Sequence, residues 1–172
     1  NSLLLSGLVR QAGAELVSAR AVGDDPAGLE AHLRQLAGRA DVIVLTGGVS
    51  AGAYDPLTRV FADSAEVAFS SVALQPGKPQ AFGRFHDAWL FGLPGNPVSA
   101  WVSFHVFVRP ALLRLHGAET HSVLPAPVRA RAVTGWSTPP VRDQYLPAVL
   151  GVDEEGLYTV EPAAPRGSQS HL

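Results

Sequence analysis

The chain has 172 residues, of which 47% are hydrophobic and 16% charged, so it can bury a substantial core and shows no sign of general disorder. A formal net charge of −2 argues against nucleic acid as a partner, and no apolar run approaches the roughly 20 residues that a membrane-spanning helix needs. The absence of cysteine excludes disulfides, thiolate zinc sites and a cysteine nucleophile, and it is compatible with the cytoplasmic location that we expect. The chain opens inside a helical pattern, so we expect it to be part of a longer protein.

The first third of the chain alternates between helical and strand patterns. Apolar residues at helical spacing predict helices over residues 1–12, from Asp25-Pro26 through Leu36, and near residues 57–62. Residues 15–22 are consistent with a short strand, and the run VIVL at 42–45 is typical of a strand buried on both faces. This alternation predicts an α/β domain with a mostly parallel sheet.

The remainder of the chain changes character twice. Residues 66–74 are strand-like, residues 80–92 resemble a hairpin, and residues 97–108 predict a helix that is apolar almost all round. Proline, glycine and short alternating runs then indicate a β-type module. We therefore divide the chain into an α/β domain, residues 1–117, and an incomplete C-terminal β-domain, residues 118–172.

The strongest local signal is the glycine-rich turn that follows the strand at 42–45. Ligands bind beyond the carboxyl ends of strands in open α/β sheets, and glycines let backbone N–H groups approach an anion closely. The turn is neither a Walker A motif nor a GxGxxG dinucleotide fingerprint. We expect an anion to bind here, the alternative being a tight turn without a ligand; the candidate residues are Thr46, Gly47, Gly48, Ser50 and Gly52.

Three carboxylates flank this turn in the sequence: Asp24, Asp25 and Asp55. If both loops lie at one edge of the sheet, the carboxylates meet beside the bound anion, and a cation must separate the like charges. Mg²⁺ suits this role because it takes one or two carboxylates and completes its shell with phosphate and water. The sequence thus predicts catalytic roles for these residues, with Asp24 and Asp55 as metal ligands. Helix capping is the alternative, and for Asp25 it is the favoured one.

Two proline-flanked motifs follow. In QPGKP (75–79) the prolines stiffen the backbone and hold the Lys78 ammonium in place for an oxyanion, whereas an isolated motif of this kind would be a solvated turn. In LPGNPVS (93–99) Asn96 is placed as an N-cap, so free helix N–H groups and the Ser99 hydroxyl offer a second anion site. Ordinary capping explains Asn96 but not the rigid segment before it. The candidate binding residues are Pro76, Gly77, Pro94, Gly95, Asn96 and Ser99.

Two further residues carry weaker signals. His105 lies on an apolar helix and is more typical of a core histidine than of a ligand, and the histidines lack the HExxH spacing of a zinc site. Arg142 in the β-module is a candidate for the site, although a surface salt bridge is the more common role for such a residue.

The segments DVIVLTGGVSAGAYD, LQPGKPQAFG and LFGLPGNPVSAWVSFHVFVRPALLRLHG, in this order and spacing, resemble the MoeA family of molybdopterin molybdenumtransferases, which includes the E domain of gephyrin. The resemblance covers residues 1–117 well and 118–172 loosely. It implies a three-layer molybdopterin-binding fold, a small C-terminal domain in the form of a partial β-barrel, and a homodimer.

The resemblance also implies an activity in molybdenum cofactor biosynthesis, namely Mg²⁺-dependent insertion of molybdate into adenylylated molybdopterin (molybdopterin-AMP) with release of AMP. The pterin adenylyltransferase is an implied partner. By motif position, Asp24 or Asp25 and Asp55 match acidic active-site residues, and Lys78 and Ser99 match positions near the molybdate and pterin. Arg142 matches an arginine that reaches towards the site, and Ser168 and Ser170 match a serine-bearing loop.

Two departures from the family pattern each remove a charge near the proposed site. The family commonly has an acidic residue where this chain has Ala53, and a lysine where it has Gln75. The N-terminal domains that complete the site of the other subunit are absent from this stretch, so we expect the chain alone to be inactive.

Two other functions stay open. The pterin adenylyltransferase shares the fold, but its loop resembles TGGTG followed by Arg-Asp, whereas this chain has TGGVSAG. A non-catalytic scaffold that dimerises through the apolar helix is the second alternative. The interpretation depends on one proposition, that Gly48, Asp55, Lys78 and Ser99 lie on one side of the molecule and share a single anion-binding cleft.

Overall fold

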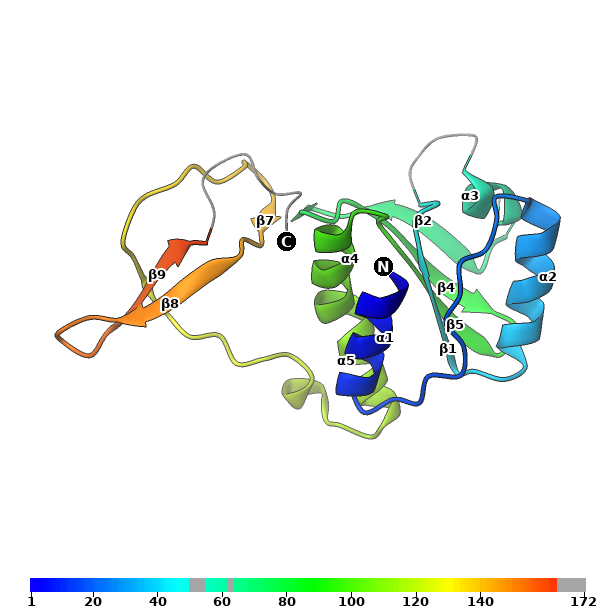
Figure 1. The fold of residues 1–172 in the computed structure, drawn as a ribbon, viewed down its shortest axis with the longest axis horizontal. Helices are drawn as coiled ribbons and strands as arrows, with labels where there is room; N and C mark the ends of the chain where they lie inside the picture. The colour runs from blue at the N-terminus through cyan, green and yellow to red at the C-terminus, as the bar shows by residue number, and fades with distance from the viewer. Residues whose placement is uncertain (50–54, 62–63, 164–172) are drawn as a thin grey trace.

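The computed structural model describes residues 1–49, 55–61 and 64–163 (Figure 1). Its centre is a four-stranded sheet in the order β1-β5-β4-β2. The strands are β1 (Val42–Thr46), β5 (Ala88–Leu93), β4 (Pro79–Phe85) and β2 (Val67–Ser71).

The strand directions confirm the α/β class and correct the expected sheet. β1 and β5 are parallel, but β4 pairs antiparallel with both β5 and β2, so the described sheet is mixed rather than mostly parallel. The physical reason is the connection: β4 and β5 are joined by the two-residue turn at His86 and Asp87, and so short a link permits only an antiparallel pair. The predicted hairpin over 80–92 is thus confirmed.

Helices cover both faces of this sheet and give it three layers (Figure 1). On one face, α2 (Pro26–Ala37) and α3 (Pro56–Val60) form a core with the strands, which includes Leu29, Leu33, Ile43, Val49, Leu57, Ala81 and Leu90. On the other face, α1 (Ser2–Gln11), α4 (Pro97–Ser103) and α5 (Arg109–Leu115) form a second core, which includes Leu8, Phe91, Leu93, Phe104, Val108 and Leu112.

The apolar helix predicted over 97–108 runs further than expected. A π-helical segment, η1 (Phe104–Val108), joins α4 to α5 without a break in the helical backbone. A proline inside a helix removes one hydrogen bond. Pro110 lies in the first turn of α5, directly after η1, so it coincides with the change from π-helical to α-helical hydrogen bonding and does not interrupt the helical backbone.

Two expectations for the sheet are wrong. Residues 15–22 form no strand; residues 17–21 are exposed, so the segment has no buried face to fix a strand register. β1 is therefore the end strand of the described sheet. It was predicted to be buried on both faces, but it is only half-buried except at Ile43.

The C-terminal part contains short strands and, among its described residues, no closed barrel. After the 3₁₀ turn η2 (Thr120–Ser122), β6 (Arg131–Ala132), β9 (Tyr158–Pro162) and β8 (Ala148–Val152) form a three-stranded sheet. β7 (Asp143–Gln144) instead pairs with β3 (Leu74–Gln75), which precedes β4. Across the described part of the chain, no helix combines the length and apolar character needed to cross a bilayer.

Candidate functional site

Three of the loops that the sequence singled out leave the sheet at one edge. Thr46 at the end of β1 lies opposite Leu93 at the end of β5, so the glycine turn and the LPGN segment start side by side. β4 runs in the opposite direction and begins at Pro79, which brings the PGKP loop to this same edge. The topology therefore places Gly48, Lys78 and the start of α4 on one side of the molecule.

The glycine turn packs directly against the LPGN segment. Gly47 and Gly48 have φ angles of 80° and 77°, in the left-handed region that favours glycine. The Gly47 N–H donates to the Leu93 carbonyl at 3.0 Å, and a Cβ on Gly95 would lie 3.4 Å from the Gly47 Cα. The Asn1 side-chain amide donates to the Gly95 carbonyl at 2.8 Å, which joins the start of α1 to this cluster. The sequence analysis missed Asn1, because an asparagine before a helix reads as an ordinary cap.

Asp55 lies against the glycine turn. It is only 9% exposed, and a Cβ on Gly48 would lie 2.8 Å from its Oδ1. The same oxygen accepts from the Leu57 N–H at 3.2 Å and caps α3. Asp55 thus has the capping role that was the alternative to metal binding, in a position next to the turn. Ser50, Gly52 and Ala53 lie outside the described residues.

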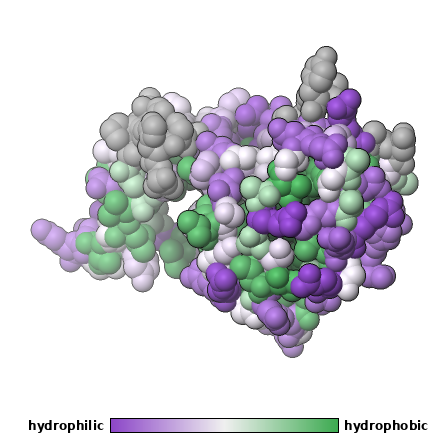
Figure 2. All heavy atoms as spheres, turned by 45° about the vertical axis from the view of Figure 1, so that its right-hand side comes forward, coloured by the Kyte–Doolittle hydropathy of each residue, from purple (hydrophilic) through white to green (hydrophobic). Residues whose placement is uncertain are grey.

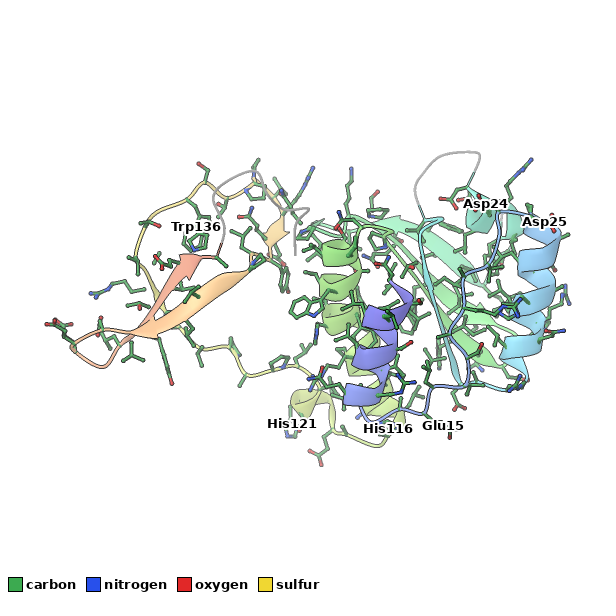
Figure 3. All side chains as sticks on the ribbon, in the orientation of Figure 1. Glu15, Asp24, Asp25, His116, His121 and Trp136 are labelled. Atoms are coloured by element: carbon green, nitrogen blue, oxygen red, sulfur yellow. The ribbon has the colours of Figure 1, made fainter. Side chains whose placement is uncertain are left out.

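Asp24 and Asp25 lie at the end of α2 that is next to α3 (Figure 3). Asp25 is the N-cap of α2, since its Oδ2 accepts from the Gly28 N–H at 2.8 Å. Asp24 is exposed and lines a cleft of about 1200 Å³ together with the glycine turn and the start of α3. The hydropathy surface of the α/β body shows apolar patches between polar residues (Figure 2), and apolar residues of β1 and α2 line much of the cleft.

The described residues include no group of three or more carboxylates and histidines that could hold a metal ion. Mg²⁺ nevertheless suits a site with one or two carboxylates, because water and phosphate complete its shell. Asp24 lines the cleft, whereas Asp55 is buried next to Gly48 and is not among the residues that line it.

The PGKP loop holds Lys78 at the surface, and the residues beneath it are buried. Lys78 is exposed, and its backbone carbonyl accepts from the Val72 N–H at 2.8 Å. Gly77 below it is buried, with a φ of 116° that only glycine adopts readily. Beneath the loop lie Gln80 and Ser103, two buried polar residues that the sequence analysis did not consider. Of the four residues expected to share one pocket, only Gly48 lines the large cleft; Asp55, Lys78 and Ser99 do not, so the expectation of a single shared pocket is wrong for the described residues.

The start of α4 corrects one part of the anion-site prediction. The Asn96 Oδ1 accepts from the Val98 N–H at 3.0 Å and the Ser99 N–H at 3.2 Å, and Pro97 has no N–H. The Ala100 N–H donates to the Asn96 carbonyl. The expected free amides are therefore already used within the helix. Ser99, 8% exposed, directs its hydroxyl to Asn96 Oδ1 at 3.5 Å.

Arg142 belongs to a different hollow from the glycine turn. It lines a pocket of about 440 Å³ within the C-terminal part, together with Trp136, labelled in Figure 3, and Asp143. It directly precedes β7, and the Tyr145 N–H after that strand donates to the Gln75 carbonyl at 2.8 Å. The strand that follows Arg142 is thus paired with Leu74 and Gln75, shortly before Lys78.

His105 packs against an aromatic neighbour but is only half-buried, so it is not the core histidine that the sequence favoured. Its ring lies 4.3 Å from the ring of Trp101. Partial burial, and secondarily the Arg109 guanidinium, lower the pKa of His105 below its ordinary value. Burial, and secondarily Arg20, likewise lower the pKa of His32, which lines the large cleft.

Comparison with known proteins now identifies the fold. Residues 1–114 match the family model described as a probable molybdopterin binding domain. The chain is 41% identical over 160 residues to molybdopterin molybdenumtransferase 2 of Mycobacterium tuberculosis, covering 87% of this chain and 38% of that protein. It is 36% identical over 117 residues to molybdopterin molybdenumtransferase of Haemophilus influenzae, covering 68% of this chain and 29% of that protein. The chain therefore spans well under half the length of these relatives.

Solved structures agree on the fold. The molybdopterin biosynthesis moeA protein from Pyrococcus horikoshii OT3 superposes with a TM-score of 0.68 at 24% identity, covering all of this chain and 38% of that one. A second structure of a molybdopterin biosynthesis moeA protein, also from Pyrococcus horikoshii, has 31% identity and a TM-score of 0.60, over 86% of this chain and 34% of that one. Together with the shared motifs and the glycine turn at the sheet edge, these matches show that the chain belongs to the MoeA family of molybdopterin-binding proteins.

Proposed function

We propose that the protein containing this chain acts in molybdenum cofactor biosynthesis, and that it inserts molybdate into molybdopterin-AMP with release of AMP. The observation that carries this proposal is the glycine turn at the carboxyl end of β1, which lines one cleft with Asp24 and packs against the buried Asp55, in a chain of the MoeA family. Relatives named molybdopterin molybdenumtransferase support it over the adenylyltransferase and scaffold alternatives.

In this proposal the glycine turn binds the pterin phosphate. Thr46, Gly47 and Gly48 line the cleft, and the two glycines bring backbone without side chains to it; Ser50 and Gly52 follow in the sequence. Asp24 and Asp55 would hold Mg²⁺, which supplies positive charge at the phosphoanhydride. Asp25 is left to its capping role.

The second group of residues places the molybdate. The Lys78 ammonium attracts the oxyanion, and Pro76 and Gly77 fix the backbone that carries it. Pro94, Gly95, Asn96 and Ser99 shape the neighbouring wall, and Arg142 adds charge from the C-terminal part. These groups work by positioning and by electrostatic stabilisation, so the reaction needs no protein nucleophile.

The proposal extends to organisation. Residues 1–117 act as the pterin-binding domain and residues 118–172 as part of a second domain. The functional unit is a cytoplasmic homodimer that receives its substrate from the pterin adenylyltransferase. The chain alone is inactive, because it spans only part of the length of its relatives.

Asp25-Pro26 and Asp55-Pro56 each start a helix, so variants of these two aspartates, together with Asp24, provide a matched test of the metal site. Asparagine keeps the oxygen that caps a helix but removes the charge that Mg²⁺ requires. AMP release by the intact protein should fall about 100-fold in Asp24→Asn and in Asp55→Asn, the size expected for one preorganised electrostatic contact. Asp25→Asn, at the N-cap of the preceding helix α2, should retain activity.

Binding of molybdopterin, measured by calorimetry, should stay within about twofold in all three variants, because the glycine turn is unchanged. Undiminished AMP release in Asp55→Asn would exclude its metal role.

A further inference from the structure

A buried polar pair connects the PGKP loop to α4. Gln80 is 7% exposed and Ser103 is fully buried. The Gln80 Nε2 donates to the Gly77 carbonyl at 2.7 Å and to the Ser103 Oγ at 2.6 Å. Both hydrogens of this amide nitrogen are therefore used. Because a carbonyl such as that of Gly77 can only accept, the orientation of the Gln80 side chain is fixed by its partners.

The fit around this pair leaves little room for movement. A Cβ on Gly77 would lie 3.0 Å from the Ser103 Oγ, 3.1 Å from the Leu74 Cδ2 and 3.6 Å from the Gln80 Nε2. Gly77 thus rests on the side chain of Ser103, while Lys78, the next residue, is exposed. The loop thus exposes Lys78 at the surface, while its Gly77 backbone is held by the buried side chains of Gln80 and Ser103.

The anchor is on the same helix as the other predicted binding groups. Ser99 and Ser103 are four residues apart in α4 and so lie on one face of the helix, one turn apart. Because Ser103 contacts the PGKP loop, this face of α4 is turned towards the loop. Gln80 therefore links two segments that are far apart in sequence, residues 75–79 and 96–103.

We propose that Gln80 is a positioning residue: by bonding Gly77 and Ser103 together, it fixes the backbone of Lys78 relative to α4 and so sets where the ammonium meets the oxyanion. The inference rests on the proposed role of Lys78 in molybdate binding. It goes beyond the motif itself, because Gln80 lies after PGKP and its side chain does not reach the surface.

The first test needs no ligand. The Val72 N–H donates to the Lys78 carbonyl at 2.8 Å, so its hydrogen exchange reports whether the loop is held. Gln80→Met preserves the length and approximate volume of the side chain but removes the Nε2 donor. Val72 exchange, followed by NMR on this chain, should become at least about tenfold faster in Gln80→Met, while Gln11→Met, on the exposed end of α1, should match the wild type.

Ser103→Ala serves as a second variant in case Gln80→Met fails to fold. It removes the link to α4 and keeps the Gln80 bond to Gly77, so a smaller acceleration at Val72 is expected. Exchange at Val72 within about twofold of the wild type in the folded variants would overturn the proposal.

The second test uses AMP release by the intact protein with molybdate and molybdopterin-AMP. The KM for molybdate should rise about tenfold in Gln80→Met, with the KM for molybdopterin-AMP unchanged, since only the lysine loop has been loosened. Faster Val72 exchange with an unchanged KM for molybdate would overturn the role in positioning Lys78. If the wild type released no AMP, the proposed function would fail, whereas the exchange measurement would still decide whether Gln80 holds the loop.

Discussion

Gly92 in β5 is the point where the sheet supports the glycine turn. A Cβ added there would lie 2.7 Å from the Val49 Cγ1 and 2.9 Å from the Ala81 Cβ. Val49 follows Gly48 directly and is 5% exposed. Its buried side chain packs on β5 and so holds the turn against the sheet. Gly92→Ala should therefore destabilise the fold and displace the turn.

The magnitude follows from these distances. Contacts of this kind are about 1 Å shorter than the optimal 3.5–4.0 Å between carbon atoms, and overpacking of a core costs about 1–3 kcal/mol. Val49→Ala removes two buried methyl groups at about 0.8 kcal/mol each and leaves a cavity, about 2–3 kcal/mol in total. Independent effects would sum to about 3–6 kcal/mol.

The double variant should fall short of that sum by about 1–2 kcal/mol, because the space vacated by Val49 accepts part of the new methyl group. Urea unfolding of the wild type, both single variants and the double variant gives the four free energies of unfolding. Additivity within about 0.5 kcal/mol would show that Val49 does not pack on Gly92, and the account of the turn would be wrong.

Two further predictions concern Asn96 and His105. Asn96→Ala should lower the free energy of unfolding by about 1 kcal/mol, because it removes the acceptor for two helix N–H groups; Asn96→Asp retains an acceptor, and an equal loss in that variant would refute the capping role. Because the pKa of His105 is lower in the folded protein than its ordinary value of 6.5, the unfolded chain binds the proton more readily, and stability is lost as the pH falls below that value. His105→Phe, which keeps an aromatic ring beside Trp101, should show a smaller fall in Tm between about pH 7 and about pH 5; the same fall in both proteins would refute this coupling.

Local chemistry made several features predictable. The Asp25-Pro26 and Asn96-Pro97 pairs mark helix starts because each supplies an acceptor followed by a residue without an N–H, and the structure has both caps. The glycines of the turn after β1 likewise signal left-handed backbone, which Gly47 and Gly48 adopt.

Strand direction and long-range contacts were not predictable in the same way. The alternation in residues 15–22 suggested a strand, but a strand exists only where a neighbour supplies hydrogen bonds, and none of the described strands pairs with it. The free amides expected at the start of α4 were absent because Asn96 already occupies them.

The glycine turns, the helix caps and the proline-flanked lysine could be located from the amino-acid sequence, since they depend on the conformational limits of single residues and their neighbours. The folded chain was needed to show that the turn after β1, the LPGN segment and the PGKP loop share one sheet edge, and that Gln80 reaches Ser103 across 23 positions of sequence. The reason is that strand register and core packing are set by contacts between distant residues, whose spacing along the chain carries no record of their separation in space.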